Sequence, residues 1–418
     1  MRPDATIDTQ VLIVGAGPAG TAAAIALRQA GVDVTLADRC DFPRDKACGD
    51  ALMPDAVQAL SRLDLKERVL ASASRPESIR IHAPDGSPIE LHGDFACLPR
   101  RVLDHGLLEA ARDAGARFLP GHRAVAPLPD RGRVRGALLA PPGVRPERRV
   151  RARLTVLATG ASPAPLRDFG VLLRRDASAI ALRAYFRVPD RVAGTFGQLH
   201  LSYEQAICPG YGWVFPGPEN VFNVGVGVFR DGLRPSDVPN LRDVWKSFVR
   251  DFRPAREIVA AGDPLAPPRG APLRCNLAGA QFHRPGLLVV GEAAGLTFPF
   301  SGEGIGKALE SGLIAAAQIA SALQSGRDDS EPDHAGADYE RNFRALHAGR
   351  YQGYRRAQSW LAWPAVCNLI ARHAGPGSFA ASRLEEMIEE RTDPRELFSP
   401  SGLLRALFSS VSSRRATS

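Results

Sequence analysis

Residues 9–20 read TQVLIVGAGPAG, and this stretch decides the fold. Its first half, Thr9 to Val14, is a short uncharged run rich in β-branched residues, which is typical of a buried parallel strand. Its second half, Gly15 to Gly20, has the spacing GxGxxG. Such a turn lets the backbone approach a diphosphate at the positively polarised start of a helix. The stretch therefore predicts the first strand, turn and helix of a dinucleotide-binding unit.

The residues that follow the turn complete this unit. Thr21 to Gln29 is alanine-rich and predicts a helix, which Gly31 is suited to end. A second apolar strand, Val32 to Ala37, ends at Asp38. Asp38 follows Gly20 by 18 residues, close to the ~20 expected for a carboxylate that binds a ribose. Strand, helix, strand and acid together indicate a bound dinucleotide.

A second glycine-rich segment follows another apolar strand late in the chain. Residues 286–290 (GLLVV) lead into GEAAG at 291–295, then into SGEGI at 301–305, with a helix expected over Lys307–Leu323. A second segment of this kind indicates FAD rather than NAD. Glu292 can bind the ribityl chain, and the helix start can stabilise negative charge on a reduced flavin. A simple strand-to-helix turn is the alternative interpretation.

Residues 209–227, PGYGWVFPGPENVFNVGVG, bear on the substrate. Tyr211 and Trp213 occupy alternating positions, so their rings point to the same side of a strand. Gly225 and Gly227 allow another group to approach the backbone closely. A flat aromatic wall beside such an opening suits a planar, apolar ligand. The alternative is that both rings pack into an ordinary sheet core.

Together these motifs resemble the geranylgeranyl reductase family, within the para-hydroxybenzoate hydroxylase-like superfamily of FAD-dependent oxidoreductases. The resemblance rests on GxGxxG, PRDKACGD at 43–50, YxWxFP, GEAAG and SGEGI, and extends thinly to 363–370 and 393–394. It implies reduction of C=C bonds in a hydrophobic, isoprenoid-bearing substrate by hydride transfer from flavin N5. Two rivals stay open: a flavin-dependent monooxygenase or tailoring enzyme that uses O2, and a flavoprotein that carries electrons to, or matures, another protein.

The resemblance also assigns roles to residues. Cys48 becomes the active-site cysteine, and Tyr211 and Trp213 become the wall of the substrate cavity. FAD would be held by Gly15, Gly17, Pro18, Ala19, Gly20, Asp38, Arg39, Arg44, Lys46, Cys48, Gly49, Arg100, Gly160, Gly291, Glu292, Gly302, Gly304 and Ile305. The neighbouring Arg44 and Lys46 could lower the pKa of the Cys48 thiol for proton transfer, although an unpaired cysteine is also a common buried hydrophobe. Glu303 is either an acid beside the flavin or an anion at a helix N-terminus.

Two departures from the family pattern matter. Glu292 stands where most relatives have an aspartate, so the carboxylate is retained on a longer arm. In 156–167 (VLATGASPAPLR), Thr159 and Pro163 replace the aspartate and serine of hydroxylase relatives. That segment handles NAD(P)H in the hydroxylases, so NAD(P)H as the direct electron donor stays open. A donor protein or a reduced flavin is the alternative.

The motif order predicts an α/β protein whose FAD-binding, Rossmann-like domain is discontinuous and of the glutathione reductase type. This domain would comprise residues 1–75, 98–172 and 270–335. Residues 175–268 alternate apolar and polar side chains, as in QLHLSY at 198–203. With a hairpin at 76–97 they would form an interleaved antiparallel β-sheet substrate domain. Residues 336–418 would form a helical C-terminal cap.

Composition agrees with a globular enzyme, because 44% of residues are hydrophobic and 23% are charged. The six cysteines show neither a CxxC pair nor metal-like spacing, so no metal site is predicted. Without a signal peptide, this cysteine usage predicts a reducing cytoplasm. The basic run Arg145–Arg153 lacks interleaved aromatic residues. It therefore predicts a solvated hairpin and no nucleic-acid partner.

The C-terminal region leaves a membrane contact open. The net charge is +8, and Trp360 to Ile370 reads WLAWPAVCNLI. Apolar residues recur at helical spacing farther on, with basic neighbours: Leu403, Leu404, Leu407, Phe408 and Val411, beside Arg405, Arg414 and Arg415. Apolar runs in the chain are shorter than the ~20 residues that span a bilayer. The region would either lie peripherally on the inner face of the membrane, where a lipid substrate is taken up, or cover the FAD domain.

Overall fold

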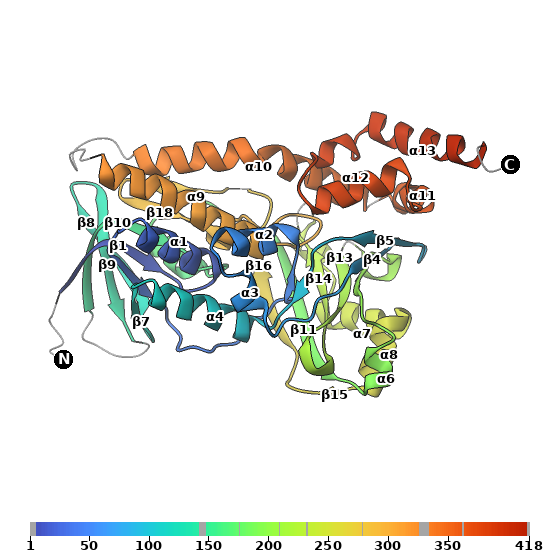
Figure 1. Ribbon diagram of the computed structural model, residues 1–418, viewed down its shortest axis with the longest axis horizontal. Helices are drawn as coiled ribbons and strands as arrows, with labels where there is room; N and C mark the ends of the chain where they lie inside the picture. The colour runs from blue at the N-terminus through green and yellow to red at the C-terminus, as the bar shows by residue number, and fades with distance from the viewer. Residues whose placement is uncertain are drawn as a thin grey trace.

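The computed structural model describes residues 6–141, 148–174, 176–208, 210–230, 233–277, 279–325, 334–361 and 363–415. Arg145 lies outside these residues, as do the side chains of Phe408, Val411, Arg414 and Arg415. Figure 1 shows two sheets beside each other. The long helices α9 and α10 run along the first sheet, and the last helices gather at the far end of the molecule, above β4 and β5.

The first sheet is parallel at its centre and has the order β17-β18-β10-β1-β2-β7. Its parallel strands are β1 (Ile7–Val14), β2 (Val34–Ala37), β7 (Arg117–Leu119), β10 (Arg148–Leu157) and β18 (Leu287–Val289). Its antiparallel additions are β8 (Arg123–Asp130), β9 (Arg133–Ala140) and β17 (His283–Arg284). The C-terminal halves of the central strands are buried on both faces, which explains apolar runs such as Val11–Val14 of β1.

Helices pack along this sheet (Figure 1). They are α1 (Pro18–Gln29), α2 (Pro54–Arg62), α3 (Lys66–Leu70), α4 (Arg100–Asp113), α5 (Pro163–Asp168), α9 (Ile305–Gln324) and α10 (His334–Trp360). Helix α1 begins at Pro18, earlier than predicted, because proline suits the first helical position. Helix α9 crosses α1 closely, since a Cβ at Gly312 would lie 2.3 Å from the Ala19 carbonyl oxygen. Small residues thus bring the glycine-rich turn against α9.

The second sheet is largely antiparallel and has the order β15-β11-β14-β13-β12-β4-β5, with β16 also paired to β11. Its strands are β4 (Ser78–His82), β5 (Pro88–His92), β11 (Ala179–Arg187), β12 (Leu199–Ser202), β13 (Gly210–Pro216), β14 (Val221–Phe229), β15 (Asp263–Pro264) and β16 (Arg269–Leu273). The segment expected as a hairpin at 76–97 pairs as β4 and β5. Strand β16, most of which was predicted within the FAD-binding segment 270–335, pairs with β11 of this sheet. The division of the chain into domains stays a proposal.

Helices α6 (Asp190–Ala193), α7 (Leu241–Asp251) and α8 (Arg253–Ala261) pack on one side of the second sheet. Phe248 and Phe252 stack there with ring centroids 5.2 Å apart. A Cβ at Gly212 would lie 2.3 Å from the Phe248 ring, so a glycine is needed on β13 for α7 to pack closely. The opposite side of β13 is thereby left to face the first sheet.

The C-terminal region is helical, as predicted. Helices α11 (Pro364–His373), α12 (Phe379–Ile388) and α13 (Pro400–Arg415) follow α10. The Tyr351 hydroxyl of α10 donates a hydrogen bond of 2.5 Å to the Leu296 carbonyl, and Tyr339 donates one of 3.1 Å to that of Val289. Among the described helices, none is both long and apolar enough to cross a bilayer.

Candidate active site

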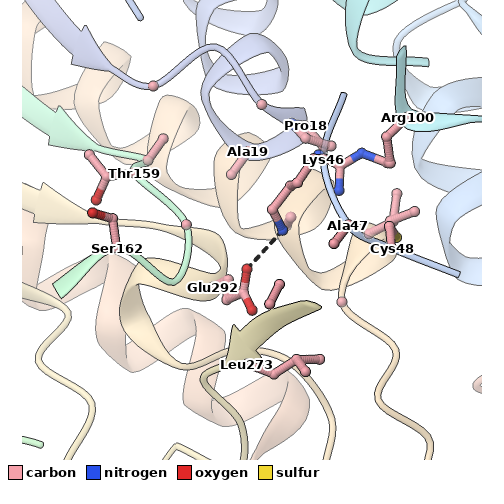
Figure 2. A pocket seen from close by; sticks show the side chains of 18 of the residues that line it. Pro18, Ala19, Lys46, Ala47, Cys48, Arg100, Thr159, Ser162, Leu273 and Glu292 are labelled. Atoms are coloured by element: carbon pink, nitrogen blue, oxygen red, sulfur yellow. Dashed lines mark hydrogen bonds and ion pairs between the residues drawn. The ribbon is translucent and has the colours of Figure 1, made fainter. Parts of the chain in front are cut away.

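A cavity lies where the carboxyl ends of the first sheet's strands face the second sheet. Val14, Ala37 and Ala158 contribute to it from the ends of β1, β2 and β10. Trp213 on β13 and Leu273 on β16 contribute from the second sheet. Ligands of open α/β sheets bind at this edge, because the strand ends and helix starts meet there. Figure 2 shows part of this cavity.

The structure brings almost every residue singled out in the sequence to this cavity. It is lined by Gly15, Gly17, Pro18, Ala19, Asp38, Arg39, Arg44, Lys46, Cys48, Gly49, Arg100, Gly160, Tyr211, Trp213, Glu292, Gly302, Gly304 and Ile305. Gly20 and Gly291 lie behind the lining. A Cβ at Gly20 would meet the Gly15 carbonyl oxygen at 1.9 Å, and one at Gly291 would meet the Ala19 Cβ at 2.9 Å. These two glycines permit close packing behind the cavity.

The glycine-rich turn is held to the second strand by Asp38. The Ala16 amide donates a hydrogen bond of 2.8 Å to Asp38 Oδ2, and the Cys40 amide donates one of 2.9 Å to Oδ1. Gly15 has a φ of 107°, and a Cβ there would lie 2.3 Å from the Ala158 carbonyl oxygen, so glycine is required on both counts. Asp38 therefore fixes the turn and also lines the cavity.

Two arginines face the turn and share one buried carboxylate. Arg100 binds Asp104 through Nε at 2.7 Å and Nη2 at 2.8 Å, and Arg44 Nη1 lies 3.1 Å from Asp104 Oδ2. A Cβ at Gly17 would lie 3.6 Å from Arg44 and 3.9 Å from Arg100. Although burial lowers the pKa of Arg100, the Asp104 charge outweighs it and the pKa is raised. Arg100 is therefore charged, and both guanidiniums lie beside the start of α1, an environment that suits a diphosphate.

An ion pair spans the middle of the cavity, joining Lys46 Nζ to Glu292 Oε2 at 3.1 Å (Figure 2). A Cβ at Gly160 would lie 3.7 Å from the same carboxylate oxygen, so this turn passes close to Glu292. Thr159 and Ser162, from the segment that departs from the hydroxylase pattern, also line the cavity on that side.

The aromatic wall is formed by Tyr211 and Trp213, whose ring centroids are 5.7 Å apart. Both are largely buried, with 8% and 3% of their surface exposed, yet both line the cavity. A Cβ at Gly225 would lie 2.1 Å from the Trp213 ring, and one at Gly302 would lie 2.0 Å from the Tyr211 hydroxyl. The glycines of 225–227 and of SGEGI therefore make room for these rings. Both rings are therefore buried in the core and also line the cavity.

A polar network behind the wall was not found from the sequence. Trp213 Nε1 donates to Asn223 Oδ1 at 2.9 Å, and Asn223 Nδ2 donates to the Cys48 carbonyl at 2.7 Å and to Asp50 Oδ2 at 2.8 Å. The Tyr185 hydroxyl also donates to Asp50. Burial raises the pKa of Asp50 to about 6, partly offset by these hydrogen bonds. The Cys48 side chain itself hydrogen-bonds Arg100.

Arg183 lies on the strand RAYF (183–186), which also resembles the family, but the sequence assigned it no role in the site. Its side chain is 2% exposed, lines the cavity and pairs with Asp45 at 2.6 Å, while Arg269 reaches the same carboxylate at 2.9 Å. The Arg183 guanidinium lies over the Tyr185 ring, 4.1 Å from its centroid. A charged residue inside an apolar strand, RAYF, is the signal that marks such a position.

These residues fit FAD. Arg44 and Arg100 beside the glycine-rich turn suit its diphosphate, and Asp38 suits its ribose. Lys46 and Glu292 bring polar groups to the cavity, and the Tyr211–Trp213 wall adds an apolar surface to it. When bound, FAD supplies hydride and electron transfer, which the protein side chains alone do not provide.

Comparisons with known proteins point to the same cofactor and to a family of reductases. The FAD binding domain family matches residues 8–184. The chain is 33% identical to the menaquinone reductase of Mycolicibacterium smegmatis, over 80% of this chain and 81% of that one. It is 31% identical to the digeranylgeranylglycerophospholipid reductase of Methanoculleus marisnigri, over 81% of this chain and 82% of that one.

Solved structures share the fold over nearly the whole chain. A geranylgeranyl bacteriochlorophyll reductase-like protein from Thermoplasma acidophilum aligns with a TM-score of 0.73 at 22% identity, covering 99% of this chain and 100% of that one. The flavin-dependent brominase Bmp2 aligns with a TM-score of 0.75 at 18% identity, covering 98% and 100%. At these identities the likeness concerns the fold, which confirms the predicted α/β class. With the curated relatives, the chain belongs to the geranylgeranyl reductase family of FAD-dependent oxidoreductases.

Proposed function

We propose that this oxidoreductase reduces carbon–carbon double bonds in the isoprenoid part of a lipid or lipid quinone. The observation that carries the proposal is the Tyr211–Trp213 wall, an apolar surface in the same cavity as the polar Lys46–Glu292 pair. An isoprenoid chain is apolar and offers isolated double bonds, so it suits such a wall. Two relatives more than 30% identical are named as reductases of isoprenoid-bearing molecules, a quinone and a digeranylgeranyl phospholipid.

The chain's own residues would position the substrate and supply a proton. Burial raises the pKa of Tyr211, so its hydroxyl stays protonated and can donate a hydrogen bond. Cys48 lines the cavity, and its backbone is fixed by Asn223. We assign substrate contact to Tyr211 and Trp213 and proton donation to Cys48. FAD would be held by the other cavity-lining residues that the sequence analysis assigned to the cofactor.

Anaerobic turnover with mass spectrometry tests the proposed function. Purified protein with FAD and dithionite is incubated separately with menaquinone and with a digeranylgeranyl phospholipid. We expect a product that has gained hydrogen in its isoprenoid chain. Trp213→Ala should keep its FAD and lose turnover, while Trp245→Ala, on α7, should keep both. Recovery of both lipids unchanged, with FAD fully reduced, would overturn the proposed substrate class.

We also propose that the C-terminal helices contact a lipid surface where the substrate enters. Trp363, at the start of α11, is 68% exposed, and Leu404, on α13, is 54% exposed. Trp360, by contrast, packs edge-on against Phe398 at 5.6 Å and belongs to the protein interior. Exposed aromatic and apolar side chains near arginines suit the headgroup region of a membrane. Trp360 therefore packs against the protein, whereas Trp363 and Leu404 would contact the lipid surface.

Co-sedimentation with anionic vesicles at low salt tests this contact. The double variant Trp363→Ser/Leu404→Ser should lose most binding. The control is Leu265→Ser, which removes an exposed leucine beside β15 on the second sheet. Equal binding by all three proteins would contradict the proposed surface.

A further inference from the structure

A buried cluster of carboxyl groups lies behind the cavity and surrounds a single ammonium. Lys307 Nζ is 3.3 Å from Asp55 Oδ2 and 2.7 Å from Glu390 Oε1, and it also hydrogen-bonds Glu310. The side chain of Lys307 is fully buried. Although burial lowers the pKa of Lys307, the surrounding carboxylates outweigh it and the pKa is raised. Lys307 is therefore the fixed positive charge of the cluster.

Glu303 adds a further carboxyl group to this cluster. Glu303 as a whole is partly exposed, but its Oε1 atom is buried and has no hydrogen-bond partner among the described residues. Asp55 Oδ2 is likewise buried without a hydrogen-bond partner among the described residues, and the two carboxyl groups lie within hydrogen-bonding reach of each other. Two carboxyl groups can hydrogen-bond to each other when one of them carries a proton. The sequence alternatives for Glu303 were an acid beside the flavin or a helix N-terminal anion, and the structure turns the side chain toward Asp55 instead.

The geometry decides which carboxyl group is charged. Asp55 begins α2, where it accepts the Ala56 amide at 2.7 Å, and it also abuts the start of α9, since a Cβ at Gly306 would lie 1.9 Å from Oδ2. Both helix starts and Lys307 favour a negative charge on Asp55. Although burial raises the pKa of Asp55, the Lys307 charge lowers it overall. Burial and, as the second cause, the nearby Asp55 charge raise the pKa of Glu303 well above its usual range.

Other charged and titratable groups surround the Asp55–Glu303 pair, from every helix that packs against it. They are Arg62 from α2, Glu310 from α9, His347, Arg350 and Tyr354 from α10, and Glu390 after α12. Burial raises the pKa of Glu310 to about 7 and lowers that of His347 to about 3. The carboxyl groups therefore outnumber the buried cation, and at least part of the excess must be neutralised by protons.

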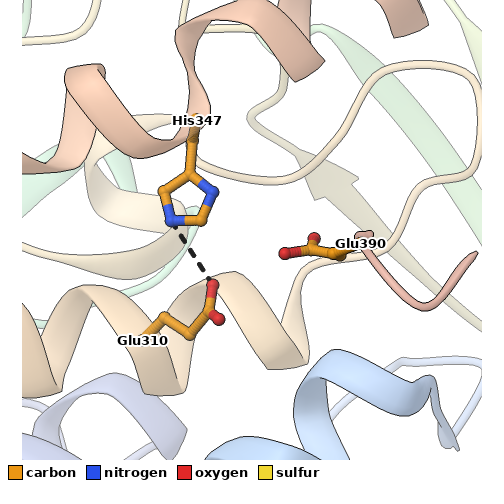
Figure 3. A group of neighbouring side chains, drawn as sticks. All are labelled: Glu310, His347 and Glu390. Carbon is orange, nitrogen blue, oxygen red and sulfur yellow. Dashed lines mark ion pairs between the residues drawn. The ribbon is translucent and has the colours of Figure 1, made fainter. Parts of the chain in front are cut away.

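Figure 3 shows Glu310, His347 and Glu390 pointing toward a common space, the residue types of a metal site. The ammonium of Lys307 binds both of these glutamates. A divalent cation there would be repelled by this charge at close range. The cluster is therefore better suited to holding protons than a metal ion.

The cluster adjoins the cofactor cavity through one loop. Gly302 and Gly304, on either side of Glu303, both line the cavity. We propose that the Asp55–Glu303 pair is a buried proton-binding site: Glu303 holds a proton that it donates to ionised Asp55, and the pair exchanges this proton when the charge in the neighbouring cavity changes. The proton moves between carboxyl oxygens and solvent, with Glu390, whose side chain is 17% exposed, as the route outward. This inference does not depend on the identity of the substrate.

Infrared spectroscopy of the FAD-free protein at neutral pH tests the resting state. We expect a carbonyl band from a protonated carboxyl group that is lost in Glu303→Gln, a variant that keeps shape and a hydrogen-bond donor. Glu109→Gln, at an exposed acid on α4, is the matched control and should keep the band. Carbon-13 chemical shifts of labelled glutamates give the same answer for the Glu303 carboxyl group, whose signal is identified by its absence from Glu303→Gln. A spectrum in which Glu303 is ionised would overturn the proposal.

Calorimetry tests the exchange. FAD binding measured in two buffers of different ionisation enthalpy gives the number of protons exchanged. We expect a proton exchange in the unmodified protein that is lost in Glu303→Gln and kept in Glu109→Gln. Equal proton exchange by the unmodified protein and Glu303→Gln would overturn the coupling to the cavity.

Discussion

Asn223 donates a hydrogen bond of 2.7 Å to the main-chain carbonyl of Cys48, from a position 175 residues farther along the chain. The same amide accepts the indole N–H of Trp213 at 2.9 Å. One side chain therefore fixes the spacing between the cysteine segment and the aromatic wall. Both segments line the cavity, so Asn223 sets its shape without lining it.

Replacing Asn223 by alanine should loosen this arrangement. The buried Trp213 N–H would lose its acceptor, which costs about 1–3 kcal/mol of unfolding free energy. We expect FAD to be retained and substrate turnover to fall, with KM rising as the wall moves. Chemical denaturation and steady-state kinetics measure the two effects. Asn368→Ala, which removes an amide on α11, is the control. Unchanged kinetics in Asn223→Ala would show that the wall does not need this bond.

Asp38→Ala should weaken FAD binding by about 1.5–3 kcal/mol, because a charge-assisted contact to the ribose is lost. The effect should exceed that of a simple contact, since Asp38 also accepts the Ala16 and Cys40 amides and so holds the glycine-rich turn. Flavin fluorescence titration gives the affinity. Asp33→Ala is a matched control. Asp33 directly precedes β2, the strand that leads to Asp38, and its carboxylate accepts a hydrogen bond from Thr9 outside the cavity. Equal affinities for both variants would argue against the ribose contact.

Asp104→Asn should destabilise the protein and weaken FAD binding together. Asp104 is fully buried and pairs with Arg100 and Arg44, so its neutralisation leaves buried guanidiniums without their counter-charge. Breaking a buried pair in this way costs about 3–5 kcal/mol. Glu109→Gln on the same helix breaks the exposed pair with Arg112 and should cost at most about 1 kcal/mol. Thermal unfolding with and without FAD separates the two losses. A fully stable Asp104→Asn protein would contradict the role of this pair.

The features found from the sequence are those that local spacing encodes. Gly15 and Asp38 follow from the strand, turn, strand pattern, and Tyr211 and Trp213 from their alternation on one strand. Such patterns arise within one element and need no knowledge of its neighbours. Arg100, by contrast, was assigned through the family resemblance, and the structure adds its ion pair with Asp104, four residues farther along the same helix.

The features missed depend on contacts between distant segments. Asn223 reaches Cys48 across 175 residues, and Arg183 reaches Asp45 across 138. Neither asparagine nor arginine carries a local signal for its partner. Glu303 shows the same limit, because its motif predicted a charge near the helix start but not the neighbouring Asp55. Side-chain direction at such loops is set by packing between elements, which the sequence pattern does not specify.

The polar network behind the wall should make stability depend on pH through Asp50. Burial raises the pKa of Asp50 to about 6 in the folded protein, against 3.8 as its ordinary value. The folded state therefore holds the proton more tightly than the unfolded state, and this contribution to stability is present at low pH and lost as pH rises through the folded pKa. Relative to Asp50→Asn, the unfolding free energy of the unmodified protein should fall by ~2.4 kcal/mol between pH ~4 and ~7.

Denaturation of the FAD-free protein across this pH range measures the difference. Asparagine suits the site because Asp50 has a φ of 69°, a conformation that asparagine tolerates. Asp64→Asn is the matched control, an exposed aspartate with a φ of 57°, and its difference from the unmodified protein should stay flat. Because Asn223 links Asp50 to the indole of Trp213, tryptophan fluorescence should follow the same transition near pH 6 and lose it in Asp50→Asn. A stability difference that is independent of pH would show that Asp50 is ionised throughout and that Tyr185 and Asn223 offset its burial completely.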